Sequence, residues 1–126
     1  MNGMRTILAT ALVTAIVAAA GSAGAAVAPA EQFPPGWSHA EINVTQAGTS
    51  HTLIYDRGRV QSVSPSAIVL RERDGSIVTI PVSPQTVVKV NGRPATLTQI
   101  KRRFQATILR VDGGAATLVR AFRAGA

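Results

Sequence analysis

Apolar residues dominate two short runs, 68–72 and 77–82, whose length is typical of β-strands. Both runs are rich in β-branched residues, and an Arg-Asp-Gly segment at 73–75 separates them. A three-residue hairpin loop takes a left-handed residue at its third position, which glycine adopts without steric cost. A two-residue Asp-Gly loop would instead shift the register by one and scatter the apolar side chains over both faces. We therefore predict a hairpin with Val78 opposite Leu70 and Ile80 opposite Ile68.

This register separates the hairpin's side chains into two sets. The inner face would carry Ile68, Leu70, Val78, Ile80 and Val82, and the outer face Val69, Arg71, Ile77 and Thr79. Pro81 cannot donate a ladder hydrogen bond, which indicates that the end of the second strand is an edge or a bulge.

Further short runs with turn signals between them predict more strands on both sides of the hairpin. The predicted strands are Ala40–Val44, Thr52–Tyr55, Gly58–Val63, Val87–Val90, Phe104–Val111 and Ala115–Phe122. Asn91-Gly92 is a strong turn signal, and Ala95–Lys101, with Thr96 as its cap, is the one helix candidate, of one or two turns. The last hairpin, around Asp112, would bury Phe104, Ala106, Ile108, Ala116 and Leu118.

Many short strands with one brief helical turn predict a mainly β fold. We expect a small antiparallel OB-like β-barrel of about five to seven short strands, over residues 37–123 with a core at 57–122. Closure would hide the edges that such short strands otherwise expose.

The chain begins with features of an export signal. Arg5 precedes a charge-free run from Ile7 to Ala20, and Ala23-Gly24-Ala25 fits the A-x-A cleavage pattern. The run is shorter than the ~20 residues that span a bilayer, so a signal peptide over 1–25 is favoured over an uncleaved anchor. Residues 26–36, rich in proline and alanine, would form a linker. We expect a secreted or extracytoplasmic protein of the cell envelope, with no transmembrane segment after cleavage near Ala25.

Composition excludes several kinds of chemistry. The chain has no cysteine, which rules out disulfides, thiol catalysis, Cys-based metal sites and a lipoprotein anchor. Loss of Arg5 with the signal would leave twelve basic and six acidic side chains, a net charge of +6. Such a charge attracts anionic partners but says nothing about fold.

We find no catalytic constellation and no cofactor motif in the sequence. Asp56 stands beside two arginines and Glu72 lies between Arg71 and Arg73, so both carboxylates are expected in solvated ion pairs. His39 and His51 could join Glu41 as metal ligands across a hairpin, but two surface histidines are the favoured interpretation. A non-enzymatic protein is therefore expected. Asn43-Val44-Thr45 matches the N-glycosylation sequon but lies in a predicted strand, so we interpret it as a chance match.

The basic residues are the one remaining feature of the sequence that indicates a function. Lys101, Arg102 and Arg103 form a run that we take as the candidate anion-binding site, while the other arginines are spread over every strand. Few aromatic residues are available for base stacking, which argues against nucleic acid as a partner. Trp37 is expected to pack against the barrel as an anchor, rather than to offer a ligand platform. The candidate partner is an anionic polymer of the cell envelope, or another envelope protein.

The alternative is a structural or protein-interaction barrel whose charge serves solubility. Convergence of the arginines on one face would separate the two interpretations.

The segment from Arg57 to Phe122 resembles a bacterial family of small OB-like barrels, catalogued only as a domain of unknown function in envelope and secreted proteins. The resemblance is carried by Gly58-x-Val60-x-x-Val63, Asp74-Gly75, Thr86-x-Val88, Asn91-Gly92, Leu97 and a hairpin that closes on Ala121. The family's glycine near the end of the short helix is replaced here by the segment Ile100-Lys101-Arg102-Arg103. The resemblance implies the fold and an envelope location, and it implies no catalytic residue.

Overall fold

The structure is a computed structural model that describes residues 33–123. The predicted signal peptide, its cleavage site and most of the linker lie outside this range. The chain divides into two units, Met1–Pro35 and Gly36–Ala126, and the second unit carries every strand described below. Within residues 33–123 no helix has the length and apolar character needed to cross a membrane.

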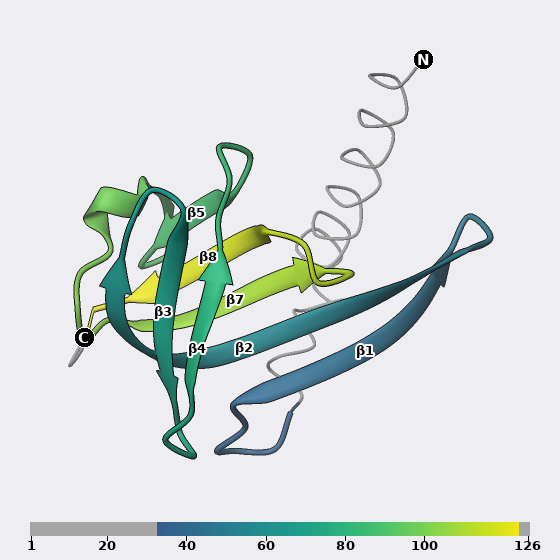
Figure 1. Ribbon diagram of the computed structural model, residues 1–126, viewed down its shortest axis with the longest axis horizontal. Coiled ribbons are helices and arrows are strands. Elements are labelled where there is room, and N and C mark those ends of the chain that lie inside the picture. Colours follow the sequence, from purple (N-terminus) through teal and green to yellow (C-terminus); the bar gives the residue numbers. More distant parts are fainter. Residues whose placement is uncertain (1–32, 124–126) are drawn as a thin grey trace. The chain divides into compact units, whose positions relative to one another are not determined.

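Eight strands of the second unit form one sheet (Figure 1). They are β1 (His39–Gln46), β2 (Thr49–Val63), β3 (Ala67–Glu72), β4 (Ile77–Pro81), β5 (Val87–Val90), β6 (Arg93–Pro94), β7 (Gln105–Val111) and β8 (Ala116–Phe122). Their order is β4-β3-β2-β7-β8-β5-β6, and β1 pairs with β2. All pairs are antiparallel except β5 with β8, which run parallel.

The fold class is confirmed as mainly β, but the predicted closure is not found. The sheet is open, with β4 and β6 at its two ends, and it does not close into a barrel. Both end strands are poor templates for further pairing, because each contains a proline that lacks the N–H donor. Strand β4 is thus an edge strand, as Pro81 indicated.

Strand β2 is longer than expected and organises the domain. Its fifteen residues replace two predicted short strands, and it curves through the domain in Figure 1. Strand β7 pairs with residues 53–59 on one edge of β2. Strand β1 pairs with residues 49–56, and β3 pairs with residues 58–63. Both overlap the β7 pairing, so β1 and β3 lie on the same edge of β2 and meet between Asp56 and Gly58.

The central hairpin has the predicted register. Val78 lies opposite Leu70 and Ile80 opposite Ile68, while Gly75 has the expected positive φ of 90°. Ile68, Leu70 and Ile80 are fully buried, whereas Ile77 on the outer face is 57% exposed.

The last hairpin departs from prediction at one position. Ala106, Ile108 and Ala116 join the core, but Leu118 does not. The pairing register shifts by one residue between Leu109 and Arg110. Val119 therefore lies opposite the buried Ile108 and points to the core in place of Leu118.

The helix candidate is one turn of 3-10 helix, Leu97–Gln99, with a capping box formed by Thr96 and Gln99. No α-helix is present in the part of the chain that the structure describes. Asn91 and Gly92 both have positive φ and form the tight β5–β6 turn, as the sequence indicated. The core of the domain is one cluster of buried residues, and Val90, Ala95 and Leu97 pack against it. It comprises Val60, Ile68, Leu70, Ile80, Val82, Val88, Ile100, Ala106, Ile108, Ala116, Val119 and Ala121.

Candidate functional site

Four arginines converge on one hollow of the surface, which we call the arginine hollow. Arg57 and Arg59 come from β2, Arg71 from β3, and Arg73 from the β3–β4 turn. The hollow has a volume of about 350 Å³. Its lining is completed by Trp37, Gly58, Glu72 and Gln105.

Strand pairing explains why these side chains meet. Arg59 lies directly opposite Arg71 on β3 and opposite Gln105 on β7. Residues opposite each other across a ladder share one face of the sheet, and alternate residues of a strand do so too. Arg57, Arg59, Arg71 and Gln105 therefore occupy the outward face, while Asp56, Gly58 and Val60 point to the core side. Three neighbouring strands thus form the floor of the hollow.

Trp37 lies beside this floor. The guanidinium carbon of Arg57 lies 5.7 Å from the centroid of the Trp37 ring, within the range of a cation–π contact. The indole is half-buried. It therefore contacts Arg57 of β2 and contributes to the lining of the hollow.

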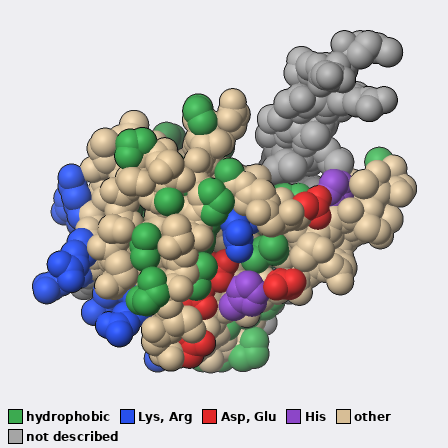
Figure 2. Space-filling view, in the orientation of Figure 1, with side chains coloured by type: hydrophobic (Ala, Val, Ile, Leu, Met, Phe, Trp, Pro, Cys, Tyr) green, Lys and Arg blue, Asp and Glu red, His purple; other side chains and the backbone are tan. Residues whose placement is uncertain are grey.

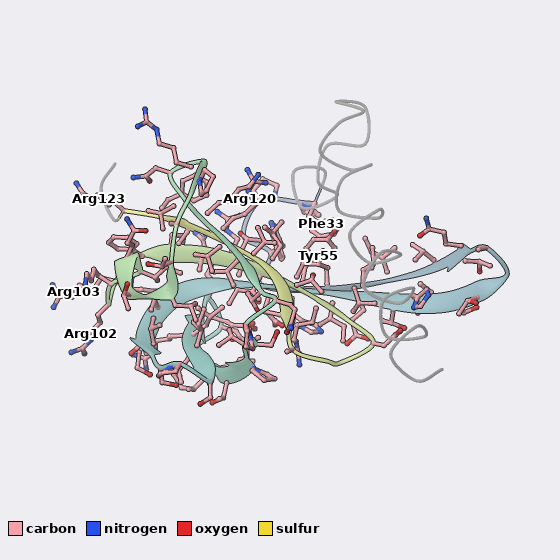
Figure 3. The ribbon with its side chains drawn as sticks, turned by 90° about the horizontal axis from the view of Figure 1, so that it is seen from above. Phe33, Tyr55, Arg102, Arg103, Arg120 and Arg123 are labelled. Atoms are coloured by element: carbon pink, nitrogen blue, oxygen red, sulfur yellow. The ribbon has the colours of Figure 1, made fainter. Side chains whose placement is uncertain are left out.

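The predicted anion-binding run is exposed and adjoins the hollow. Lys101, Arg102 and Arg103 are all exposed. The backbone N–H of Arg103 donates to the carbonyl of Val60 at 2.9 Å, so the run lies beside the residue that follows Arg59. Figure 3 shows Arg102 and Arg103 at the same end of the domain as Arg123.

Few of the basic side chains within residues 33–123 pair with a carboxylate. Figure 2 shows most Lys and Arg side chains of this face toward one end, while both histidines lie beside acidic side chains elsewhere. Within residues 33–123, Arg110 is the arginine that pairs with a carboxylate, at 3.7 Å from Asp56. The four arginines of the hollow and the basic run have no such partner among the described residues.

The ion pairs predicted for Asp56 and Glu72 are therefore wrong. Both carboxyl groups are buried, with 1% of Asp56 and 6% of Glu72 exposed. Each stands at an inward position of its strand, and the flanking arginines point to the opposite face. Sequence neighbours in a strand cannot pair across the sheet, which is why adjacency misled the prediction.

The two buried carboxyl groups instead form a cluster with His39. The Nδ1 atom of His39 lies 2.7 Å from Oδ1 of Asp56, and its Nε2 atom lies 2.9 Å from Oε2 of Glu41. One donor atom from each of His39, Asp56 and Glu72 lies within 4.8 Å of the others. We call these three residues the acid–histidine cluster.

Electrostatics in this cluster favours an uneven distribution of protons. Burial, the largest cause, and the neighbouring Asp56 together raise the pKa of Glu72 to about 8. Hydrogen bonds to Asp56 and then to Glu41 raise the pKa of His39 above its usual 6.5, against the opposing effect of burial. The carboxyl group of Glu72 therefore keeps its proton at neutral pH.

The structure does not bring together His39, His51 and Glu41, the metal ligands considered from the sequence. His51 lies opposite Val44, whereas His39 lies opposite Asp56 at the other end of the β1–β2 pair. His51 instead contacts Asp112, with 2.7 Å between Nδ1 and Oδ2. Asp112 also accepts the backbone N–H of Thr52 at 2.8 Å, and these contacts lower the pKa of its carboxyl group. It is a turn residue with φ 55°, as predicted.

A signal for the acid–histidine cluster was present in the sequence. Glu72 follows Ile68 and Leu70 at intervals of two, a spacing that places all three on one face of a strand, although we expected Glu72 in a solvated ion pair. Asp56 has the same parity as Val60 along β2. A charged residue at an inward position is uncommon unless it has partners, and this conflict marks both residues. The identity of the partner, His39, required the β1–β2 register.

Comparison of this chain with protein-family models, with curated proteins and with solved structures found no match.

Proposed function

We propose that this protein is a non-enzymatic binding module for an anionic polymer, and that the arginine hollow with the adjoining run Lys101–Arg103 is its contact surface. The observation that carries the proposal is the convergence of Arg57, Arg59, Arg71 and Arg73 on one hollow. Four like charges on adjacent strands repel one another, and no described carboxylate pairs with them. An anionic ligand would relieve this repulsion.

The form of the surface favours an extended ligand over a small one. The hollow is lined by residues of β2, β3 and β7, and the basic run lies beside Val60, the residue that follows Arg59. Arginine forks bind phosphate and carboxylate oxygens in a bidentate manner, so a chain of repeating acidic groups could be held at successive points. OB-like modules bind polymers on one face of a curved sheet, and we infer the same mode here.

We also propose that the protein acts outside the cytoplasm, after cleavage near Ala25. The export features at the start of the chain support this location. Anionic polymers of the cell envelope, such as teichoic acids, would then be the accessible ligands. N-terminal sequencing of the protein from envelope or medium should give a start at Ala26 or within a few residues of it, and an intact Met1 there would refute the location.

The binding test uses the purified chain, an immobilised teichoic acid, and a double variant, Arg59→Ala with Arg71→Ala. These two residues form the cross-strand pair of the hollow. Loss of two charge-assisted contacts should weaken binding at 0.15 M salt by about tenfold or more. By analogy with other polyanions, the slope of log affinity against log salt should fall by about 1.5.

The matched control is Lys89→Ala with Arg93→Ala, which removes the same charge from exposed positions on β5 and β6. Strands β7 and β8 separate these positions from β2. The control should keep wild-type affinity, and Arg102→Ala with Arg103→Ala should show an intermediate loss. Equal losses of affinity in all three double variants would show that binding depends on net charge alone, and would refute the proposed site.

Two further arms test the class of ligand. Single-stranded DNA and vesicles of anionic phospholipid present the same charges in other forms, and both should bind more weakly than the teichoic acid at equal salt. If none of the anionic ligands binds the wild type, the alternative of a structural or protein-interaction domain replaces the proposal.

A further inference from the structure

The acid–histidine cluster has buried oxygen atoms without a hydrogen-bond partner. These are Oδ2 of Asp56 and Oε2 of Glu72. A buried polar atom that makes no hydrogen bond destabilises the native state, and more so when it is charged, so such atoms are uncommon in native proteins unless they serve a ligand or water. Both side chains belong to residues at least nine-tenths buried.

We propose that His39, Asp56 and Glu72 form a binding site for a divalent transition metal ion, with Zn²⁺ as the preferred ion. The three donors come from β1, β2 and β3, at the point where β1 and β3 meet on one edge of β2. Backbone pairing brings the three residues together. His39 lies directly opposite Asp56, and Glu72 lies opposite Gly58, two residues further along β2.

The distances suit a metal ion after small movements of side chains. The donor atoms lie within 4.8 Å of one another, whereas ligands bound tetrahedrally at about 2.0–2.2 Å lie roughly 3.3–3.6 Å apart. Side-chain rotations that move the donor atoms by about 1–1.5 Å would close this difference. Gly58 assists, because the absence of its side chain lets the backbone of β3 come close enough to place Glu72 beside Asp56.

The contacts of His39 are those of a metal ligand held by a second carboxylate. Its Nδ1 atom faces Asp56 inside the cluster, while Nε2 contacts Glu41 outside it. Metal-binding histidines commonly donate their other ring N–H to a carboxylate, which fixes the tautomer and the ring orientation. The His39 side chain is 44% exposed, so the ion has a path from solvent and a coordination position open to water.

The donor set narrows the choice of ion. One imidazole nitrogen with two carboxylate oxygens suits Zn²⁺, and less well Mn²⁺, whereas Mg²⁺ prefers oxygen ligands and retains its waters. Arg110 opposes binding, since its Nη2 atom lies 3.7 Å from Oδ2 of Asp56. Arg110→Gln should therefore strengthen Zn²⁺ binding.

The test is calorimetric titration of the chelator-treated full chain with Zn²⁺, Mn²⁺ and Mg²⁺. The wild type should bind one equivalent of Zn²⁺, more tightly than Mn²⁺ and with no measurable Mg²⁺ binding. His39→Ala and Glu72→Gln should each weaken Zn²⁺ binding at least tenfold. Glu72→Gln keeps the shape and neutrality of protonated Glu72, so this variant should remain folded.

His51→Ala is the matched control, because His51 also contacts a carboxylate, that of Asp112, but outside the cluster. It should bind Zn²⁺ as the wild type does. Substitution by Co²⁺ adds a second readout, since a four-coordinate ion with these ligands absorbs strongly in the visible range and the signal should vanish in Glu72→Gln. Absence of Zn²⁺ binding by the wild type, or equal binding by all variants, would overturn the proposal and leave a cluster held by shared protons alone.

Discussion

Gly58 is the residue at which one methyl group should disturb both candidate sites. It lies on β2 opposite Glu72, between the arginines of the hollow and beside Asp56. A Cβ atom at this position would lie 2.5 Å from the carbonyl oxygen of Arg71 and 2.9 Å from its carbonyl carbon. Both are backbone atoms, so no flexible side chain can move aside. The β2–β3 pair would have to separate by about 0.5 Å or more to reach a tolerable contact.

The expected cost of Gly58→Ala follows from this clash. Overpacking in a well-packed region typically costs about 1–3 kcal/mol, whereas the entropic gain from replacing glycine in the unfolded chain is only about 0.4–1 kcal/mol. For a domain of this size each kcal/mol corresponds to about 4–8 °C in Tm. We therefore expect Gly58→Ala to lower Tm by roughly 5–15 °C, measured by circular dichroism.

Gly114→Ala is the matched control for this prediction. A Cβ at Gly114 would meet only the carbonyl oxygen of Val111 at 3.4 Å, an ordinary contact, and Gly114 has no positive φ. The entropic gain is the same as at Gly58. Gly114→Ala should therefore be neutral or slightly stabilising. Equal Tm values for the two variants would refute the close approach of β2 and β3 on which the geometry of both sites depends.

Two further predictions concern the core and the buried acid. Ile80→Ala should lower the free energy of unfolding by about 2–5 kcal/mol, because Ile80 is fully buried. Ile77→Ala, at a residue that is 57% exposed, should lower it by less than about 0.5 kcal/mol. Similar chemical denaturation midpoints for the two variants would show that the hairpin register is wrong. The raised pKa of Glu72, about 8 against 4.5 in an unfolded chain, means that the native state retains a proton that the unfolded state releases, so stability should fall as pH rises from about 4.5 to 8 in metal-free buffer. The raised pKa of His39 lowers stability in the same direction as the pH rises above 6.5. Glu72→Gln should remove most of this dependence of stability on pH. An unchanged pH profile of stability in that variant would contradict the raised pKa of Glu72.

Local patterns decided much of the fold. Two runs rich in β-branched residues and an Arg-Asp-Gly loop were enough to place Val78 opposite Leu70, because side-chain period and loop length together fix a hairpin register. The Asn91-Gly92 turn and the short capped turn at Thr96 were also readable, since each depends on residues close in sequence.

Contacts between distant segments were beyond the sequence alone. The parallel pairing of β5 with β8 depends on how separate hairpins dock. The bulge that turns Leu118 away from the core lies within the β7–β8 hairpin, and the sequence analysis did not anticipate it. Failure of the sheet to close depends on the ends of the whole sheet, which no local pattern describes.

The candidate sites divide in the same way. The sequence by itself determined that arginines are abundant and that Lys101–Arg103 form one basic run, but it led us to expect Glu72 in a solvated ion pair. Only the tertiary structure brought Arg57 and Arg59 beside Arg71, and placed His39 against Asp56, seventeen residues away. The physical reason is that pairing across strands sets which side chains meet, and a strand separates its own neighbours onto opposite faces of the sheet.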